Sequence, residues 1–121
     1  DFDLPDNLIK SACLLSGLFD LEPVRLSNAN EWARLDKESA FRNSPIYHMP
    51  NASCPIIIGW GENETEEFKR QSDLYRVAWL SRGWPCLSME FSGKHHFASM
   101  PDLMYPEEPC TQALLSQIGL N

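Results

Sequence analysis

The sequence predicts an α/β fold with a parallel sheet. Three short apolar runs, at residues 8–16, 55–60 and 85–91, have the length of strands. The middle run is rich in isoleucine and has no polar alternation, which is typical of a strand buried on both faces. Long segments with helical patterns separate the runs, and parallel strands need crossover connections of this kind. The order strand, helices, strand, helix, strand, loop, helix therefore indicates β-α-β units.

Length and charge narrow the class of protein. The 121 residues fit one domain, because domains usually hold ~100–200 residues. A formal net charge of −7 argues against nucleic acid or an anionic membrane as a partner. No apolar run approaches the ~18 residues of a membrane span, and the chain opens with no secretory signal pattern. We therefore expect one globular domain with neither a nucleic-acid nor a membrane partner.

The four cysteines form no C-x-x-C pair. Three of them lie in or at the start of the apolar runs, which favours buried, reduced thiols over a disulfide set or a metal site. The cysteines thus indicate a cytoplasmic protein, and we expect no metal and no cofactor.

In the first half of the chain, a strand leads into helices. The first strand is expected over residues 8–16, followed by a loop over residues 16–23 with turn residues at both ends. Helical signals dominate residues 27–43 in two short helices, which end before Pro45 because the residue before a proline disfavours the helical region. A loop over residues 45–53 then leads to the second strand.

In the second half, a long helix joins the second and third strands. We expect it over residues 65–82, with Thr65 as N-cap and two glutamates in its first turn, where the helix dipole favours negative charge. The residues expected on its apolar face are Phe68, Leu74, Val77, Ala78 and Leu80. The third strand is followed by a turn at residues 92–97, a proline-rich loop at 101–109 and a closing helix at 110–118.

Chemically active side chains follow two neighbouring strands of this sheet. Glu62 and Glu64 come after the second strand, and His95 and His96 come after the third. The carboxyl ends of parallel strands meet at one edge, where open α/β sheets place their chemistry. An imidazole held by a carboxylate through one ring nitrogen can act as a general base through the other. In the α/β-hydrolases the triad follows the order Ser, Asp or Glu, His, and this sequence has the second and third members without a Gly-x-Ser-x-Gly motif.

Four segments resemble the kynurenine formamidase (arylformamidase) branch of the α/β-hydrolases. They are Ser-Gly-Leu-Phe-Asp-Leu-Glu-Pro at 16–23, Arg-Asn-Ser-Pro at 42–45, Glu-Glu-Phe-Lys-Arg-Gln-Ser at 66–72 and His-His-Phe at 95–97. The resemblance covers essentially the whole chain, in order and with compatible spacing. It implies that residues 1–121 correspond to the C-terminal half of an α/β-hydrolase catalytic domain, with about three parallel strands and flanking helices.

The resemblance also implies a site and a reaction. By position in these motifs, the catalytic acid falls on Glu64 and the catalytic histidine on His96. Glu64 departs from the many relatives that carry Asp, and His95 stands where some relatives have Asp. The parent would be a serine hydrolase of tryptophan catabolism that cleaves a small aryl formamide or carboxyl ester through an acyl-enzyme. The serine and a His-Gly-Gly oxyanion loop would lie in an N-terminal half before Asp1, in the same or a separate chain, so we expect this chain alone to be inactive.

Less specific interpretations stay open beside this one. Glu62 could replace Glu64 as the acid, or Glu64 could be a solvated turn carboxylate and His96 a helix-capping residue. A homodimer is not decided by the sequence. The alternative function is a non-catalytic interaction module that pairs through an open sheet edge, since nothing in the chain supplies a second neighbour for the first strand.

Several other polar and aromatic residues have a structural role as their simplest explanation. His95 and His48 are expected to be structural, and a zinc site at His95 and His96 is disfavoured because adjacent histidines lack the usual ligand spacing. Asp20 is expected to orient the loop after the first strand. The tryptophans Trp32, Trp60, Trp79 and Trp84 are expected in the core or its shell.

Overall fold

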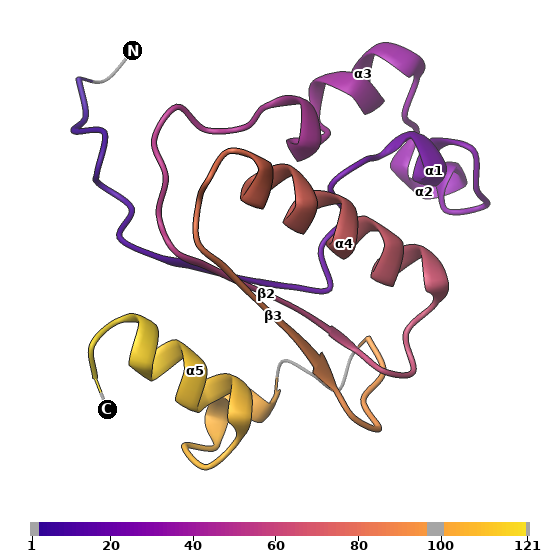
Figure 1. Ribbon diagram of the computed structural model, residues 1–121. Helices are drawn as coiled ribbons and strands as arrows, with labels where there is room; N and C mark the ends of the chain where they lie inside the picture. Colours follow the sequence, from indigo (N-terminus) through magenta and orange to yellow (C-terminus); the bar gives the residue numbers. More distant parts are fainter. Residues whose placement is uncertain (1–2, 97–100, 121) are drawn as a thin grey trace.

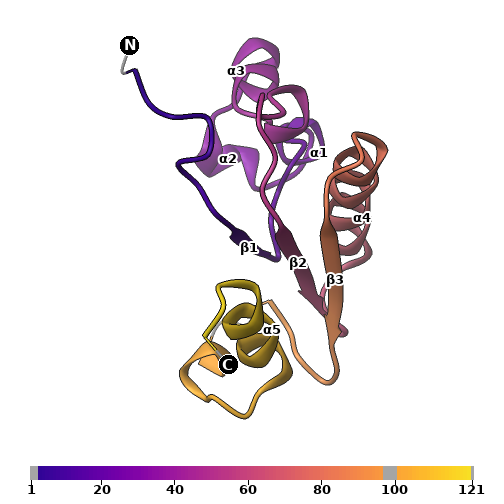
Figure 2. The same ribbon diagram turned by 60° about the vertical axis from the view of Figure 1, so that its left-hand side comes forward.

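A computed structural model describes residues 3–96 and 101–120. Three parallel strands form one sheet: β1 (Ala12–Leu15), β2 (Ile56–Gly61) and β3 (Cys86–Phe91) (Figure 1). Their order in the sheet is β1-β2-β3 (Figure 2). Helix α4 (Glu66–Ser81) lies against one face of the sheet and helix α5 (Pro109–Gln117) against the other (Figure 2). The predicted α/β class and the three parallel strands are confirmed.

The core lies between the sheet and α4. β2 is the central strand, and its side chains at Ile56, Ile57 and Ile58 are buried, as its uninterrupted apolar sequence predicts. Ile56 and Ile58 pack with Tyr75 and Trp79 of α4. Ile57 points to the opposite face, because side chains alternate along a strand.

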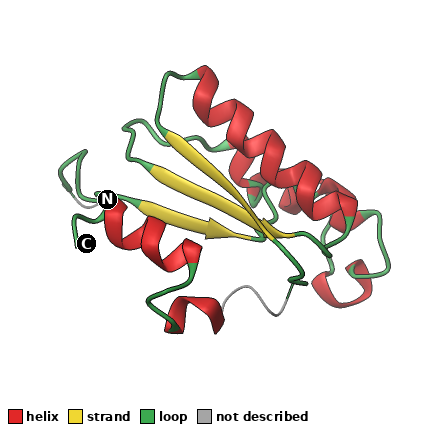
Figure 3. Cartoon of the chain, turned by 60° about the horizontal axis from the view of Figure 1, so that its bottom comes forward, coloured by secondary structure: helices red, strands yellow, loops and turns green. Residues whose placement is uncertain are grey.

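The first strand is shorter than predicted. β1 covers only four residues, and Leu8 and Ile9, expected within the strand, are exposed. The ladder between β1 and β2 begins where Ala12 pairs with Ile56. The ladder does not extend toward the N-terminus of β1, because Pro55, the residue before β2, has no N–H to donate. Within the described residues, β1 has β2 as its one strand neighbour (Figure 3).

The connection from β1 to β2 contains more helix than predicted. It holds α1 (Glu22–Arg25), α2 (Asn30–Ala33), α3 (Lys37–Arg42) and a 3₁₀ turn (Pro45–Tyr47). α1 begins inside the predicted loop, because Asp20 Oδ1 accepts the Glu22 backbone N–H at 3.0 Å. The expected role of Asp20 in orienting this loop is thereby confirmed. α3 lies within the predicted helical segment, and Asp36 and Ser39 form a capping box at its start.

The buried face of α4 differs from the predicted one. Its buried residues are Gln71, Ser72, Tyr75 and Trp79. Three of the residues expected on the apolar face, Leu74, Val77 and Leu80, are exposed instead. Thr65 does stand at the N-cap, but its side chain makes no capping hydrogen bond. Gln71 takes the inner face because its side-chain amide finds hydrogen-bond partners there.

The remaining elements lie near their predicted places. A 3₁₀ turn (Pro101–Met104) falls in the proline-rich loop, and α5 begins one residue earlier than expected. Trp32 is 88% exposed, so its expected place in the core or shell is wrong. None of the helices in the described part of the chain is both long and apolar enough to cross a membrane.

Candidate active site

Backbone hydrogen bonds join the two turns that follow β2 and β3. The Glu62 N–H donates to the Phe91 carbonyl at 2.9 Å, and the Asn63 N–H donates to the Lys94 carbonyl at 2.9 Å. Gly61 precedes this acidic turn, and a Cβ there would lie 2.4 Å from the Lys94 carbonyl oxygen. Only glycine therefore allows the two turns to approach so closely. This approach sets the acidic turn beside the residues that lead to His96.

Glu64 and His96 form a hydrogen bond across these turns. Glu64 Oε1 lies 2.6 Å from His96 Nδ1, within the ~2.6–3.2 Å reach of a catalytic hydrogen bond. The Glu64 side chain is fully buried, whereas the His96 side chain is 39% exposed. A carboxylate can only accept, so the proton between them resides on Nδ1 when Glu64 is ionised. Nε2 is then the nitrogen able to accept a proton.

Two further donors bind the second oxygen of Glu64. Oε2 accepts the Gly61 backbone N–H at 2.6 Å and the Ser16 hydroxyl at 2.7 Å. Burial alone raises the pKa of the Glu64 carboxyl, but the hydrogen bonds from Gly61, Ser16 and His96 outweigh it, and the pKa lies below its ordinary value. The arrangement therefore keeps Glu64 ionised beside the imidazole.

Glu62 binds the turn after β3. It accepts the Gly93 backbone N–H at 2.7 Å and the Ser92 hydroxyl at 3.0 Å, and it is exposed. The Gly93 amide and then the Ser92 hydroxyl hold the pKa of Glu62 below its ordinary value. Of the two carboxylates in the acidic turn, Glu64 is thus the one hydrogen-bonded to the His96 ring, and Glu62 stabilises the turn that precedes it.

Phe68 supports the ring of His96. Their ring centroids lie 4.4 Å apart with an interplanar angle of 30°. Phe68 belongs to the first turn of α4, directly after the acidic turn. The sequence pattern assigned it to the core face, whereas the structure stacks it on the histidine.

Ser16 is the site residue that sequence reasoning missed. It follows β1 directly and is buried, and its backbone φ of 51° lies in the left-handed region. Ser16 does not stand in the Gly-x-Ser-x-Gly motif of a nucleophilic serine. Its hydrogen-bond partner Glu64 lies 48 positions away in the sequence, so no local pattern connects the two residues. The one signal in the sequence is a polar residue before Gly17, at the carboxyl end of a predicted strand.

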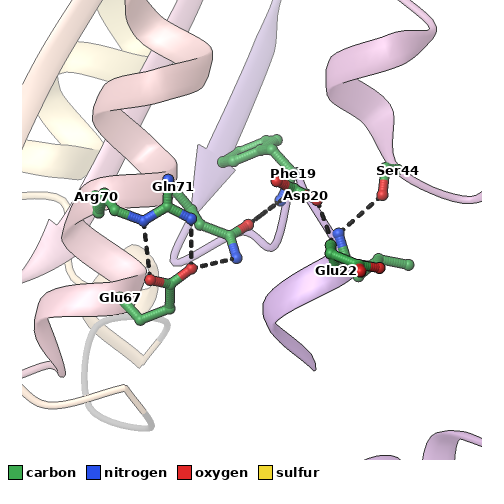
Figure 4. Close-up of polar contacts among 8 residues, drawn as sticks. Phe19, Asp20, Glu22, Ser44, Glu67, Arg70 and Gln71 are labelled. Carbon is green, nitrogen blue, oxygen red and sulfur yellow. Dashed lines mark hydrogen bonds and ion pairs between the residues drawn. The ribbon is translucent and has the colours of Figure 1, made fainter. Parts of the chain in front are cut away.

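A second polar network fixes the loop that begins at Ser16. The buried Gln71 amide oxygen accepts the backbone N–H groups of Phe19 at 2.7 Å and Asp20 at 2.9 Å (Figure 4). The Gln71 amide nitrogen donates to Glu67 Oε1 at 2.9 Å, and Glu67 also pairs with Arg70. These bonds attach the loop after β1 to the first turns of α4. Both segments lie at the carboxyl edge of the sheet, as the candidate site does.

The other histidines lie at the surface. His95 and His48 are both exposed, and the rings of His48 and Phe41 form an edge-to-face contact, with centroids 6.1 Å apart. Phe97, the last residue of the His-His-Phe motif, lies outside the described residues. In residues 3–96 and 101–120, no three His, Cys, Asp or Glu side chains gather in a way that could hold a metal ion.

Comparisons with known proteins agree with the fold and the resemblance. No family model matches the chain. It is 34% identical to a kynurenine formamidase of Danio rerio over 116 residues and 31% identical to one of Salmo salar over 117 residues. Each alignment covers 92% of this chain but only 40% of the relative, so the chain spans about two fifths of the length of these proteins.

Solved structures share the fold. A Silicibacter protein described as a thioesterase superposes with a TM-score of 0.76 at 24% identity, over 94% of this chain and 40% of that one. Thermogutta terrifontis esterase 2 superposes with a TM-score of 0.58 at 20% identity, over 92% and 42% of the two chains. The chain is therefore similar to the kynurenine formamidases over nearly all of its length, and its fold is that of part of an α/β-hydrolase.

Proposed function

We propose that this chain supplies the acid and the base of a serine hydrolase of the arylformamidase or esterase type. The observation that carries the proposal is the 2.6 Å hydrogen bond between buried Glu64 and partly exposed His96 at the carboxyl edge of the sheet. The two groups follow neighbouring parallel strands in the order that an α/β-hydrolase triad requires. The similarity to kynurenine formamidases over 92% of the chain points to the same class.

In this mechanism, His96 accepts the proton of a serine as the serine oxygen attacks a carbonyl carbon. Nε2 takes that proton, and the ring becomes an imidazolium whose charge Glu64 stabilises through Nδ1. His96 then donates the proton to the leaving amine or alcohol, which leaves an acyl-enzyme. Water attacks the acyl-enzyme with His96 again as base and releases a carboxylic acid. The proposed substrates are small aryl formamides and carboxyl esters.

The serine and the oxyanion donors come, in this proposal, from a segment that precedes the chain in the whole protein. The edge strand β1 supports this, because in the described part of the chain its second side faces no other strand. An apolar hollow of about 390 Å³ lies beside it, lined in part by Leu8, Ile9, Tyr75 and Trp79. We propose that the missing part of the sheet and its helices pack at this edge. A cytoplasmic location, a role in tryptophan catabolism and a homodimer stay predictions.

The rival proposal is an interaction module that pairs through the same edge without catalysis. An open edge fits both proposals. The Glu64–His96 pair favours the hydrolase, because an interaction surface has no need of a buried carboxylate aligned on an imidazole.

The experiment compares the whole protein, meaning this chain joined to its preceding segment, with residues 1–121 alone. Hydrolysis of an N-formyl aryl amine and of a p-nitrophenyl ester is followed spectroscopically, and a fluorophosphonate probe is mapped by mass spectrometry. We expect turnover by the whole protein, a label on a serine outside this chain, and loss of both turnover and labelling in His96→Gln. Turnover by residues 1–121 alone, or a label within them, would contradict the proposal. Partner binding without hydrolysis would favour the rival.

A further inference from the structure

We infer that Ser16 is a positioning residue that fixes the Glu64 carboxylate in the orientation in which it faces His96. This inference rests on the proposed hydrolase function and adds a third component to the pair, contributed by a third strand. Ser16 follows β1, Glu64 follows β2 and His96 follows β3. Each strand of the sheet thus delivers one member of a single hydrogen-bonded chain.

The geometry at Glu64 separates its two oxygens by role. Oε2 accepts two hydrogen bonds, from the Gly61 amide and the Ser16 hydroxyl, and Oε1 faces His96 Nδ1. Gly61 precedes Glu64 by only three residues, so its amide moves with the acidic turn. Ser16 lies on a different strand, and its hydroxyl ties the carboxylate to the sheet itself. Without that hydroxyl the carboxylate retains one donor on Oε2 and can rotate about it.

The backbone of Ser16 serves this contact. Its φ of 51° is a conformation that side chains rarely adopt and that glycine adopts freely. The Ser16 N–H continues the ladder by donating to the Gly59 carbonyl at 2.8 Å, so the chain is still attached to β2 where it turns. A glycine would satisfy the turn without strain, which indicates that the serine is present for its hydroxyl. Ser16 is buried, and its hydroxyl donates to Oε2, the Glu64 oxygen that does not contact the imidazole. Because this hydroxyl bonds the acid and not the base, Ser16 is distinct from the proposed nucleophile.

Two substitutions separate the hydroxyl from the backbone. Ser16→Ala removes the hydroxyl and keeps Cβ, and Ser16→Gly removes the hydroxyl and relieves the left-handed strain. The matched control is Ser92→Ala, which removes the same kind of serine-to-carboxylate bond from the exposed Glu62. All are made in the whole protein. kcat and KM are measured together with the proton resonance of His96 Nδ1–H, which a short bond to a carboxylate shifts far downfield and which His96→Gln assigns.

We expect both Ser16 variants to lose roughly 10- to 100-fold in kcat with little change in KM, because misplacing a catalytic group by about 1 Å can cost about 100-fold. The downfield resonance should shift or broaden in both. Ser92→Ala should stay within about twofold of the parent in kcat and leave the resonance unchanged, as exposed substitutions usually do.

A Ser16→Gly variant with full kcat and an unchanged resonance would overturn the inference, because Ser16 would then serve only the turn. Loss of kcat with the resonance unchanged in both variants would overturn it too. Ser16→Gly guards against a folding failure, since glycine fits the left-handed backbone. If the parent hydrolyses nothing, the resonance alone decides: a shift in the Ser16 variants sustains the positioning role while the proposed function fails.

Discussion

Replacing Glu64 by glutamine tests the role of this side chain most directly, because the surrounding donors dictate how the amide must sit. Oε2 of Glu64 accepts two donors, the Gly61 N–H at 2.6 Å and the Ser16 hydroxyl at 2.7 Å. In Glu64→Gln the amide oxygen therefore takes this place, and the amide NH₂ points at His96 Nδ1. The opposite orientation would set NH₂ against the Gly61 N–H and leave a buried donor unpaired, at a cost of about 1–3 kcal/mol.

The consequence for His96 is the wrong tautomer. An NH₂ group can only donate to Nδ1, so the ring proton moves to Nε2, the nitrogen that must accept the serine proton. The amide also offers no charge to the imidazolium. The equivalent change in a serine protease lowers kcat about 10⁴-fold, and we expect a smaller loss of about 10³-fold here, or ~4 kcal/mol of transition-state stabilisation. KM should change little.

Glu62→Gln is the matched control. Glu62 accepts hydrogen bonds from Ser92 and Gly93, and a glutamine oxygen can accept both, so kcat should stay within about threefold. Steady-state kinetics of the whole protein with an N-formyl aryl amine give both values, and ¹⁵N NMR of the histidine rings reports the tautomer. A Glu64→Gln enzyme within tenfold of the parent, or a larger loss in Glu62→Gln, would refute the assignment of the acid.

Four further predictions concern stability, each measured by chemical unfolding of the whole protein followed by circular dichroism. Gly61→Ala should lower the free energy of unfolding by about 1–3 kcal/mol, because the new Cβ would lie 2.4 Å from the Lys94 carbonyl oxygen; an unchanged midpoint would refute this close approach. Gln71→Leu should cost about 2–4 kcal/mol, because two backbone amides of the loop after β1 lose their acceptor; a smaller loss would mean that water replaces it. Trp32→Gln should change stability by no more than about 0.5 kcal/mol, since the side chain is 88% exposed, and a larger loss would reveal a partner surface. The pKa of Glu64 is lowered on folding, so the ionised carboxylate stabilises the folded state above its ordinary pKa of 4.5, and this stabilisation is lost as the pH falls through the folded value. The difference in unfolding free energy between the parent and Glu64→Gln should therefore shrink in acid. A difference that stays constant with pH would contradict the lowered pKa.

The parts of the fold predicted from sequence are those that local patterns determine. The isoleucine run at 56–58 identifies a strand buried on both faces, and β2 is the central strand. Strand order and direction then bring the ends of β2 and β3 to one edge, so the meeting of the acidic turn with the histidine pair could be predicted from their positions after two adjacent strands. The choice of Glu64 and His96 within these two turns came from the motif positions of the resemblance. No side-chain detail was needed for this, because parallel strands share an edge by construction.

The parts that could not be predicted depend on partners distant in sequence. Gln71 and Ser72 occupy the buried face of α4 although a hydropathy pattern assigns that face to leucine and valine. Gln71 is buried because its amide oxygen accepts backbone N–H groups of the loop after β1, 52 positions earlier at Phe19, while its amide nitrogen donates to Glu67 within α4. Helical periodicity contains no information about such a partner. The length of β1 likewise depends on Pro55, which belongs to the neighbouring segment.

The geometry of the candidate site is set by the register of the sheet more than by its loops. Gly61 pairs with Phe91 at the end of the β2–β3 ladder, and the hydrogen bonds between the acidic turn and the turn after β3 continue that ladder directly. A slip of one residue would move the histidine turn by about 3.3 Å relative to Glu64, more than the 2.6 Å that separates the two side chains. The ladder between β1 and β2 sets Ser16 in the same way, through the bond of its N–H to Gly59. The three side chains thus stay aligned because each is at most a few residues from a paired strand, and an insertion within any of these short turns should disrupt the site while leaving the strands intact.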